Sequence, residues 1–409
     1  MTTPVPLWGK TPTEVDIFGE RLRDARVIQR MKAQDVAGVT GIAPERYSRL
    51  ENSLSTTMDA MRARQLASAL DFPLPFFTSA PVTPVQRGSL LFRAKKAMTR
   101  GEEDQLVAWA RLIGDLLHRS VQERVRLPYL RIPRATDEST PAEAALGTRK
   151  ALGLAPDEPI PHLTRALERS GVYVASLDFG AELHAKNHDA FSTWVGPSLD
   201  YALIVVRSHS SWERTRLSIA HELGHLVMHH IRRDGDLESD AYSFASEILI
   251  PQPILRAEWP RSATLMSLMP LKRTWGVSFA ALIEAAYRGG LIDGAHRINL
   301  YKQMSNRRDR QTGERWRVQE PGWRDRESER PKLVAKVLET AFDSPPDLES
   351  LSRFIYGWRP DLIGQLLAGQ VTPWAQSVAI ATRDNEGGHY EPSQLAPVLT
   401  LKRGGSRHE

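Results

Sequence analysis

The chain has 409 residues, of which 41% are hydrophobic, with a formal net charge of +5 and no cysteine. Its length supports two or three folded units, since single cores rarely grow past roughly 250 to 300 residues. The lack of cysteine excludes disulfides, thiolate metal sites and cysteine catalysis. The sequence has no apolar stretch near the roughly 20 residues that cross a bilayer and no signal-peptide pattern at its start, so we expect a soluble, cytoplasmic protein.

Residues 16–78 are predicted to form an all-α unit of four short amphipathic helices, with turns at Gly41 and Asn52. The hydrophobic pattern predicts a shared core made of Leu22, Ala25, Val36, Ala37, Leu50, Leu66 and Leu70. The runs Gln34 to Gly41 and Ala43-Pro-Glu-Arg-Tyr-Ser-Arg-Leu-Glu51 resemble the Xre class of helix-turn-helix domains.

This resemblance implies that Gln34 starts the second helix and that Ile42 to Glu51 is the recognition helix, with Pro44 in its first turn. The candidate DNA-binding residues, which could reach bases or phosphates of an operator-like site, are Gln34, Arg46, Ser48 and Arg49. Between Asp16 and Thr78 there are nine basic and eight acidic side chains, so the prediction rests on the motif rather than on charge. A compact domain that only contacts proteins is the alternative.

Residues 79–139 are predicted to be a linker followed by a long helix over Glu102 to Val125. That helix carries an apolar stripe formed by Leu106, Trp109, Leu112, Ile113, Leu116 and Leu117. Such a stripe fits either a buried core or the seam of a homodimer.

Residues 140–300 are predicted to form an α+β unit with a small sheet. The pattern indicates helices over 142–152 and 162–170 and strands over 172–177 and 203–206. A peptide substrate is expected to add as a strand to an exposed sheet edge near Phe191 to Val195.

The run His221-Glu-Leu-Gly-His225 lies within a predicted amphipathic helix over 212–231. Positions i and i+4 lie about 40° apart and about 6 Å along the axis, so His221 and His225 project toward a single ion. Glu222 then lies beside that ion. Two imidazoles plus one oxygen ligand suit zinc in an open catalytic site, which predicts a metal-activated hydrolase.

A third ligand has to come from another segment, because one helical face cannot close three sides of a tetrahedron. Residues 237–251 read as a second helix that ends before Pro251, with a core stripe formed by Ala241, Phe244, Ala245, Ile248 and Leu249. Glu238 opens this helix on its buried side and is the preferred ligand, whereas Asp240 and Glu247 read as solvated or capping groups. His229 and His230 are rival ligands, although His229 fits better as a polar group at the helix end near the site.

The segments Arg214 to His229 and Glu238 to Pro251 resemble the ImmA/IrrE family of zinc metallopeptidases, as do Asp189 to Trp194 and Glu158 to Pro161. The resemblance implies a zincin-like metallopeptidase domain with zinc on His221, His225 and Glu238 and with Glu222 as the general base. It also implies site-specific cleavage of a helix-turn-helix repressor, in the control of a stress response or a mobile element.

No residue is predicted with certainty to stabilise the oxyanion, and the candidates are His184, His188 and Tyr242. Residues 301–409 are predicted to be a partly disordered, helical C-terminal extension, with helices over 332–342 and 348–356 and poor order over 384–409. Its mixed-charge, tryptophan-bearing runs 306–317 and 322–330 read as solvated loop, with a nucleic-acid surface as the alternative.

Two functions remain open from the sequence. In the first, the protein is a DNA-associated zinc metalloendopeptidase that cuts a repressor-type regulatory protein. In the second, it is a DNA-binding transcriptional regulator whose zinc-binding domain senses a ligand or metal and cleaves nothing. The presence of Glu222 favours cleavage, because a sensor needs the ligands but not the base.

Overall fold

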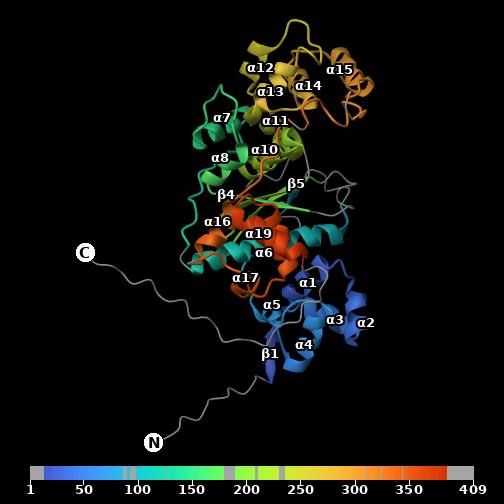
Figure 1. Cartoon of the computed structure of the whole chain (residues 1–409), viewed down its shortest axis with the longest axis vertical. Helices are drawn as coiled ribbons and strands as arrows, with labels where there is room; N and C mark the ends of the chain where they lie inside the picture. Colours follow the sequence, from blue (N-terminus) through green and yellow to red (C-terminus); the bar gives the residue numbers. More distant parts are fainter. Residues whose placement is uncertain are drawn as a thin grey trace, which may run out of the picture.

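A four-stranded mixed sheet lies in the middle of the molecule, with helices on both of its faces (Figure 1). The computed structural model describes residues 13–85, 90–92, 98–123, 125–178, 189–207, 211–229, 235–310, 312–323, 325–342 and 344–384. The strand order is β3 (Leu91–Phe92), β5 (Ala190–Val195), β6 (Tyr201–Arg207) and β4 (Val172–Leu177). β4 and β6 are parallel and the other pairs are antiparallel. This combination of helices and small sheets is the predicted α+β class.

Alternate residues of the inner strands are buried on opposite faces of the sheet. Val172 and Val174 of β4 belong to one hydrophobic cluster, whereas Tyr173 and Ala175 belong to another. Because side chains alternate along a strand, a run that is apolar throughout is expected where both faces are covered. The sheet therefore separates two cores.

One face of the sheet is covered by α7 (Pro141–Ala151), α8 (Leu163–Arg169), α10 (Trp212–Met228) and α11 (Leu237–Leu249). Further helices extend this half of the molecule: α12 (Gln252–Glu258), α13 (Met269–Trp275), α14 (Phe279–Arg288) and α15 (Gly294–Asn306). The sequence pattern located the first four helices and assigned no helix to 252–306.

The opposite face is covered by α6 (Arg100–Gln122) together with α16 (Leu333–Thr340) and α18 (Pro360–Ala368). α17 (Leu348–Phe354) and α19 (Pro373–Asp384) complete this layer, drawn in red in Figure 1. The second core runs from the N-terminal helices through α6 to these C-terminal helices, and so crosses the boundaries at residues 79, 140 and 301 that we expected. The predicted disorder after Asp384 concerns residues outside the described ones.

The N-terminal unit contains more elements than the four predicted helices. These are β1 (Glu14–Ile17), α1 (Gly19–Ile28), α2 (Ala33–Thr40), α3 (Pro44–Asn52), β2 (Thr56–Asp59), α4 (Ala60–Ala69) and α5 (Leu74–Thr78). β1 and β2 pair as antiparallel strands. The predicted core residues are buried except for Leu50, which is half-buried.

The helix boundaries around the turn differ slightly from the prediction. α2 begins at Ala33 rather than Gln34, and α3 begins at Pro44 rather than Ile42. Proline has a fixed φ and no N–H, so it suits the first position of a helix, where the N–H has no intrahelical partner. Gly41 has a left-handed φ of 65° and ends α2.

The apolar stripe of α6 forms part of the core within this chain, because all six of its residues are buried. Two buried ion pairs connect this helix to α1. Arg21 of α1 lies 2.6 Å from Asp115 of α6, and Arg111 of α6 pairs with Asp24 of α1. All four side chains are buried, so the N-terminal unit is attached to the helix that lies under the sheet.

The expected free edge at Phe191 to Val195 is wrong at Phe191 and Ser192, which β3 covers. β5 is an inner strand, because Leu91 and Phe92 of β3 pair with Ser192 and Phe191 on the side of β5 that faces away from β6. The partner strand comes from a part of the chain about 100 residues earlier, and a local pattern carries no information on such long-range pairing.

The mixed-charge segment after α15 is only partly a solvated loop. Most of residues 307–318 are exposed, but two acidic residues farther along turn inward. Glu320 pairs with Lys272 of α13 at 3.0 Å, and Glu329 pairs with Arg216 of α10 at 2.5 Å. The segment therefore helps to hold α10 in place.

We expect Glu329→Gln to destabilise the fold by about 3 to 5 kcal/mol, because it leaves the fully buried Arg216 without its counter-charge. Burial tends to raise the pKa of Glu329, but His162 and Arg216 outweigh it and lower that pKa to about 2. This lowered pKa stabilises the fold above pH 4.5, and the contribution is lost as the pH falls toward 2. Urea unfolding should show that Glu329→Gln has a lower free energy of unfolding than wild type at pH 7, and a much smaller difference near pH 2.

The matched control is Glu349→Gln, which removes an exposed pair with Arg353 and should cost about 1 kcal/mol or less. Equal effects of the two substitutions would contradict the buried ion pair.

Among the described residues, none of the helices combines the length and the apolarity that a bilayer crossing requires.

Candidate metal centre

The histidine-bearing helix, α10, is capped at its start by a side chain. The Ser211 hydroxyl accepts a hydrogen bond from the Arg214 N–H and caps the start of the helix. The sequence predicted burial on one side, but nearly all of α10 is buried, because α7, α8, α11 and two strands surround it. The polar residues of the motif are therefore placed in the interior of the domain.

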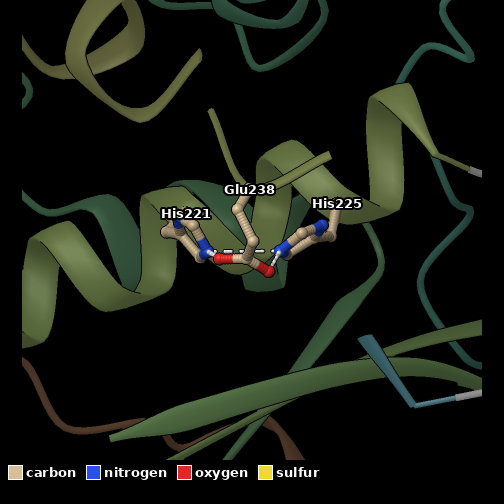
Figure 2. A group of neighbouring side chains, drawn as sticks. All are labelled: His221, His225 and Glu238. Atoms are coloured by element: carbon tan, nitrogen blue, oxygen red, sulfur yellow. Dashed lines mark hydrogen bonds and ion pairs between the residues drawn. The ribbon is translucent and has the colours of Figure 1, made fainter. Parts of the chain in front are cut away.

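Three donor atoms from α10 and α11 converge at one point, as Figure 2 shows. His221 Nε2 lies 3.1 Å from His225 Nε2. Each of these nitrogens lies 3.3 Å from an oxygen of Glu238. Ligands at the 2.0 to 2.1 Å typical of zinc occupy tetrahedron corners about 3.3 to 3.4 Å apart. Each nitrogen faces its own oxygen of Glu238, Oε2 toward His221 and Oε1 toward His225, so two imidazoles and one carboxylate surround a space that fits a zinc ion.

The position of Glu238 depends on the close approach of α10 and α11. A Cβ atom at Gly224 would lie 3.0 Å from the Phe244 ring and 3.2 Å from the Ala241 backbone. The glycine between the two histidines thus lets α11 lie directly against α10. Since Glu238 precedes Ala241 by one helical turn, this contact brings its carboxylate to the histidines.

The electrostatics of the group favour an ionised carboxylate. Burial tends to raise the pKa of Glu238, but its hydrogen bonds to His221 and His225 outweigh burial and lower the pKa to about 2. Its side chain keeps 36% of its exposure, whereas the two histidines are buried. The open side of the cluster is therefore on the side of Glu238.

Glu222 lies next to the cluster and is oriented by the sheet. Its side chain is buried, and the Ser192 hydroxyl of β5 donates a 2.7 Å hydrogen bond to its Oε2 atom. A hydrogen bond to a carboxylate is stronger than one between neutral groups and fixes the direction of the acceptor. Ser192 was missed in the sequence, although the run Asp189 to Trp194 that contains it was noted.

A small hollow with about 10 Å³ of free space, partly open to solvent, lies beside His221 and Glu222. Its other walls are formed by Asp189, Ala190, Leu217, Ser218 and Tyr242. The Tyr242 ring packs on His221 with 4.3 Å between ring centroids. Tyr242 is thus the oxyanion candidate that the structure places at the site, while His184 and His188 lie outside the described residues.

The other carboxylates of α11 do not join the group. Glu247 accepts a hydrogen bond from the Gln252 N–H at 3.1 Å, which is the capping role that we expected. Asp240 is partly exposed and is not part of the donor cluster. The core stripe of α11 is buried as predicted.

With this geometry in place, the chain can be compared with known families. Residues 167–287 match the Peptidase M78 family, the IrrE N-terminal-like domain. The match starts in α8 and ends in α14, a little under a third of the chain, and contains the whole His-His-Glu group. It supports the ImmA/IrrE resemblance and a peptidase of the metallopeptidase class. A comparison with curated proteins gave no match.

The predicted DNA-binding residues lie apart from the M78 domain, defined by residues 167–287. Gln34 is exposed on α2, and Arg46, Ser48 and Arg49 are exposed on α3. In Figure 1 these two helices lie at the right-hand outer edge of the N-terminal unit, away from α10 and α11. The side chains are therefore available to an external partner and do not contribute to the metal centre.

We expect Ser192→Ala to slow peptide hydrolysis about tenfold or more, because a hydrogen bond to a charged group contributes roughly 1.5 to 3 kcal/mol. Zinc content should not change, since Ser192 contacts the base and not the ligands. The control is Ser120→Ala, which removes a buried hydroxyl bonded to a helix carbonyl in α6. Equal cleavage rates for the two variants would remove Ser192 from the site.

Proposed function

We propose that this protein is a zinc metalloendopeptidase that binds DNA through its N-terminal unit and cleaves a repressor-type regulatory protein. The observation that carries the catalytic part is the convergence of His221, His225 and Glu238 beside a buried, oriented Glu222. Two imidazoles and one carboxylate are a donor set that suits zinc and keeps a coordination position open.

The roles of the side chains follow from their positions. A bound zinc ion would act as a Lewis acid and lower the pKa of a coordinated water toward ~7. Glu222 accepts a proton from the attacking water and later donates it to the leaving amine. Ser192 holds the carboxylate of Glu222 in one orientation during both transfers. The hollow beside Leu217 and Tyr242 leaves about 10 Å³ of free space, which is room for about one water molecule next to Glu222.

A second function, in which the domain only senses a metal or ligand, requires the three ligands but no base. The burial of Glu222 and its bond to Ser192 favour hydrolysis over sensing, because burying a polar side chain is costly and only hydrolysis uses it as a base. The test is to co-express candidate helix-turn-helix repressors with wild type or with Glu222→Gln and to follow processing of the repressor.

The repressor substrate and the role in a stress response or a mobile element rest on the ImmA/IrrE resemblance, which the domain match supports. DNA binding rests on the Xre-like pattern and on the exposure of its candidate residues. In this proposal the N-terminal unit either targets the peptidase to an operator or holds a partner repressor.

We expect Arg46→Ala combined with Arg49→Ala to weaken binding to DNA at least tenfold, because each arginine contact to a base contributes about 1 to 3 kcal/mol. The probe is a duplex selected by the wild-type protein from a random-sequence library, and the readout is its retention at a fixed salt concentration. The matched control, Arg261→Ala with Arg273→Ala, removes the same charge from exposed positions near α13. Unchanged retention after the first double substitution would exclude α3 as the recognition helix.

A further inference from the structure

His229 lies one helical turn after His225, and the Nδ1 atoms of the two rings face each other. The two Nδ1 atoms are 2.9 Å apart, and the ring centroids are 5.0 Å apart. The backbone N–H of His229 also bonds to the carbonyl of His225 at 3.0 Å, where α10 ends. Both rings are buried. His229 is thus tied to His225 through its backbone and its side chain.

This arrangement separates His229 from the ligands. Among the described residues, the donor group that could hold an ion contains His221, His225 and Glu238. Eight residues separate His229 from His221, and the helix rotates by about 80° over that distance, so the third imidazole lies off the axis of the first two. This geometry does not support His229 as an alternative metal ligand. His230, the other alternative, lies outside the described residues.

We propose that His229 is a positioning residue that fixes the tautomer and the ring orientation of the zinc ligand His225. The inference rests on the zinc-binding part of the proposed function and extends it to a residue outside the ligand set. His225 presents Nε2 to Glu238 and His221, and an imidazole that binds a metal through Nε2 carries its hydrogen on Nδ1. That Nδ1–H then donates to Nδ1 of His229.

The physical reason for such a residue is that a free imidazole can place its hydrogen on either nitrogen and can rotate about χ2. A ring with its hydrogen on Nε2 has no lone pair for the metal on that side. An acceptor opposite Nδ1 stabilises the tautomer that can bind, and it adds basicity to the ligand. Carboxylates and backbone carbonyls usually provide this acceptor, and here a buried imidazole takes their place.

The experiment compares the zinc affinity of three full-length proteins at one fixed pH: wild type, His229→Leu and His229→Asn. Leucine has a similar size but no acceptor, whereas the side-chain oxygen of asparagine can lie close to the position of the imidazole Nδ1. Competition for zinc with a chromophoric chelator gives each dissociation constant. We expect the leucine variant to bind zinc 10- to 100-fold more weakly and the asparagine variant to stay within about threefold of wild type.

Two further measurements separate positioning from a general loss of structure. Thermal unfolding of the metal-free proteins reports whether each variant folds, and His229→Ala replaces the leucine variant if that one does not. Visible absorption of the cobalt-loaded proteins reports ligand geometry, so the leucine or alanine variant should show altered bands and the asparagine variant the wild-type bands.

Zinc affinities of the leucine and asparagine variants that fall equally, or that both stay within threefold of wild type, overturn the positioning role. Failure of wild type to bind zinc overturns both this inference and the zinc site. A third outcome is that the two variants differ in zinc affinity as expected, while wild type and Glu222→Gln process the repressor equally. This outcome supports the positioning role of His229 and removes only the proteolytic function.

Discussion

Glu222→Gln is expected to reduce cleavage of a co-expressed helix-turn-helix repressor by about 10²- to 10⁴-fold, which is the range that general acid–base catalysis contributes. Glutamine has nearly the same shape and can still accept a hydrogen bond from Ser192, but it cannot take up a proton from water. Since Glu222 is not part of the His-His-Glu group, the zinc content of the variant should equal that of wild type. The readouts are the rate of appearance of the cleaved fragment and the metal content by mass spectrometry.

The matched control is Glu247→Gln on α11, a half-buried carboxylate that caps the next helix and does not reach the cluster. It should cleave at nearly the wild-type rate. If Glu222→Gln processes the repressor as fast as wild type, hydrolysis at this centre is excluded and the sensing function becomes the better explanation.

The second large effect is expected from Glu238→Ala. Structural zinc sites bind with roughly 10 to 16 kcal/mol over four ligands, so removing one ligand should weaken zinc binding by about 10² to 10³-fold. Native mass spectrometry should find one zinc per chain for wild type and little or none for the variant at equal, micromolar zinc. Zinc should also raise the melting temperature of wild type much more than that of the variant, because it binds the folded chain.

Asp240→Ala is the control for this substitution, since Asp240 lies on the same helix outside the donor group. The ligand assignment would be overturned by a Glu238→Ala protein that keeps its zinc. If His229→Ala also loses zinc entirely, the third ligand is the imidazole of His229.

The grouping of His221, His225 and Glu238 beside Glu222 could be predicted because each side chain's direction depends on local periodicity. The spacing of His221 and His225 fixes one helical face, and the position of Glu238 relative to Ala241 fixes the face of the next helix. The close contact at Gly224 was not predicted, although it decides how near the two helices approach. A helical phase gives the direction of a side chain and not the distance between two helices.

Features that depend on contacts between distant segments could not be predicted from local periodicity. The hydrogen bond from Ser192 to Glu222 joins a strand to a helix. The β3 strand, which pairs with β5, comes from a part of the chain about 100 residues earlier. Likewise, Glu329 belongs to the run 322–330, whose composition is typical of a solvated loop, and Glu320 lies just before that run, yet each has a buried cationic partner. Composition describes the average of a segment, whereas single charges are placed by tertiary contacts.

The ion pairs between α1 and α6 also bear on how the proposed DNA and protein partners would be held relative to each other. Moving the N-terminal helices away from α6 would separate two arginines from two aspartates. Each broken pair would cost several kcal/mol of free energy. The N-terminal unit therefore moves together with the sheet, and does not behave as a module on a flexible tether. If α3 binds DNA, the metal centre would then lie at a fixed distance and orientation relative to that DNA. Only a protein substrate held at that distance would reach Glu222.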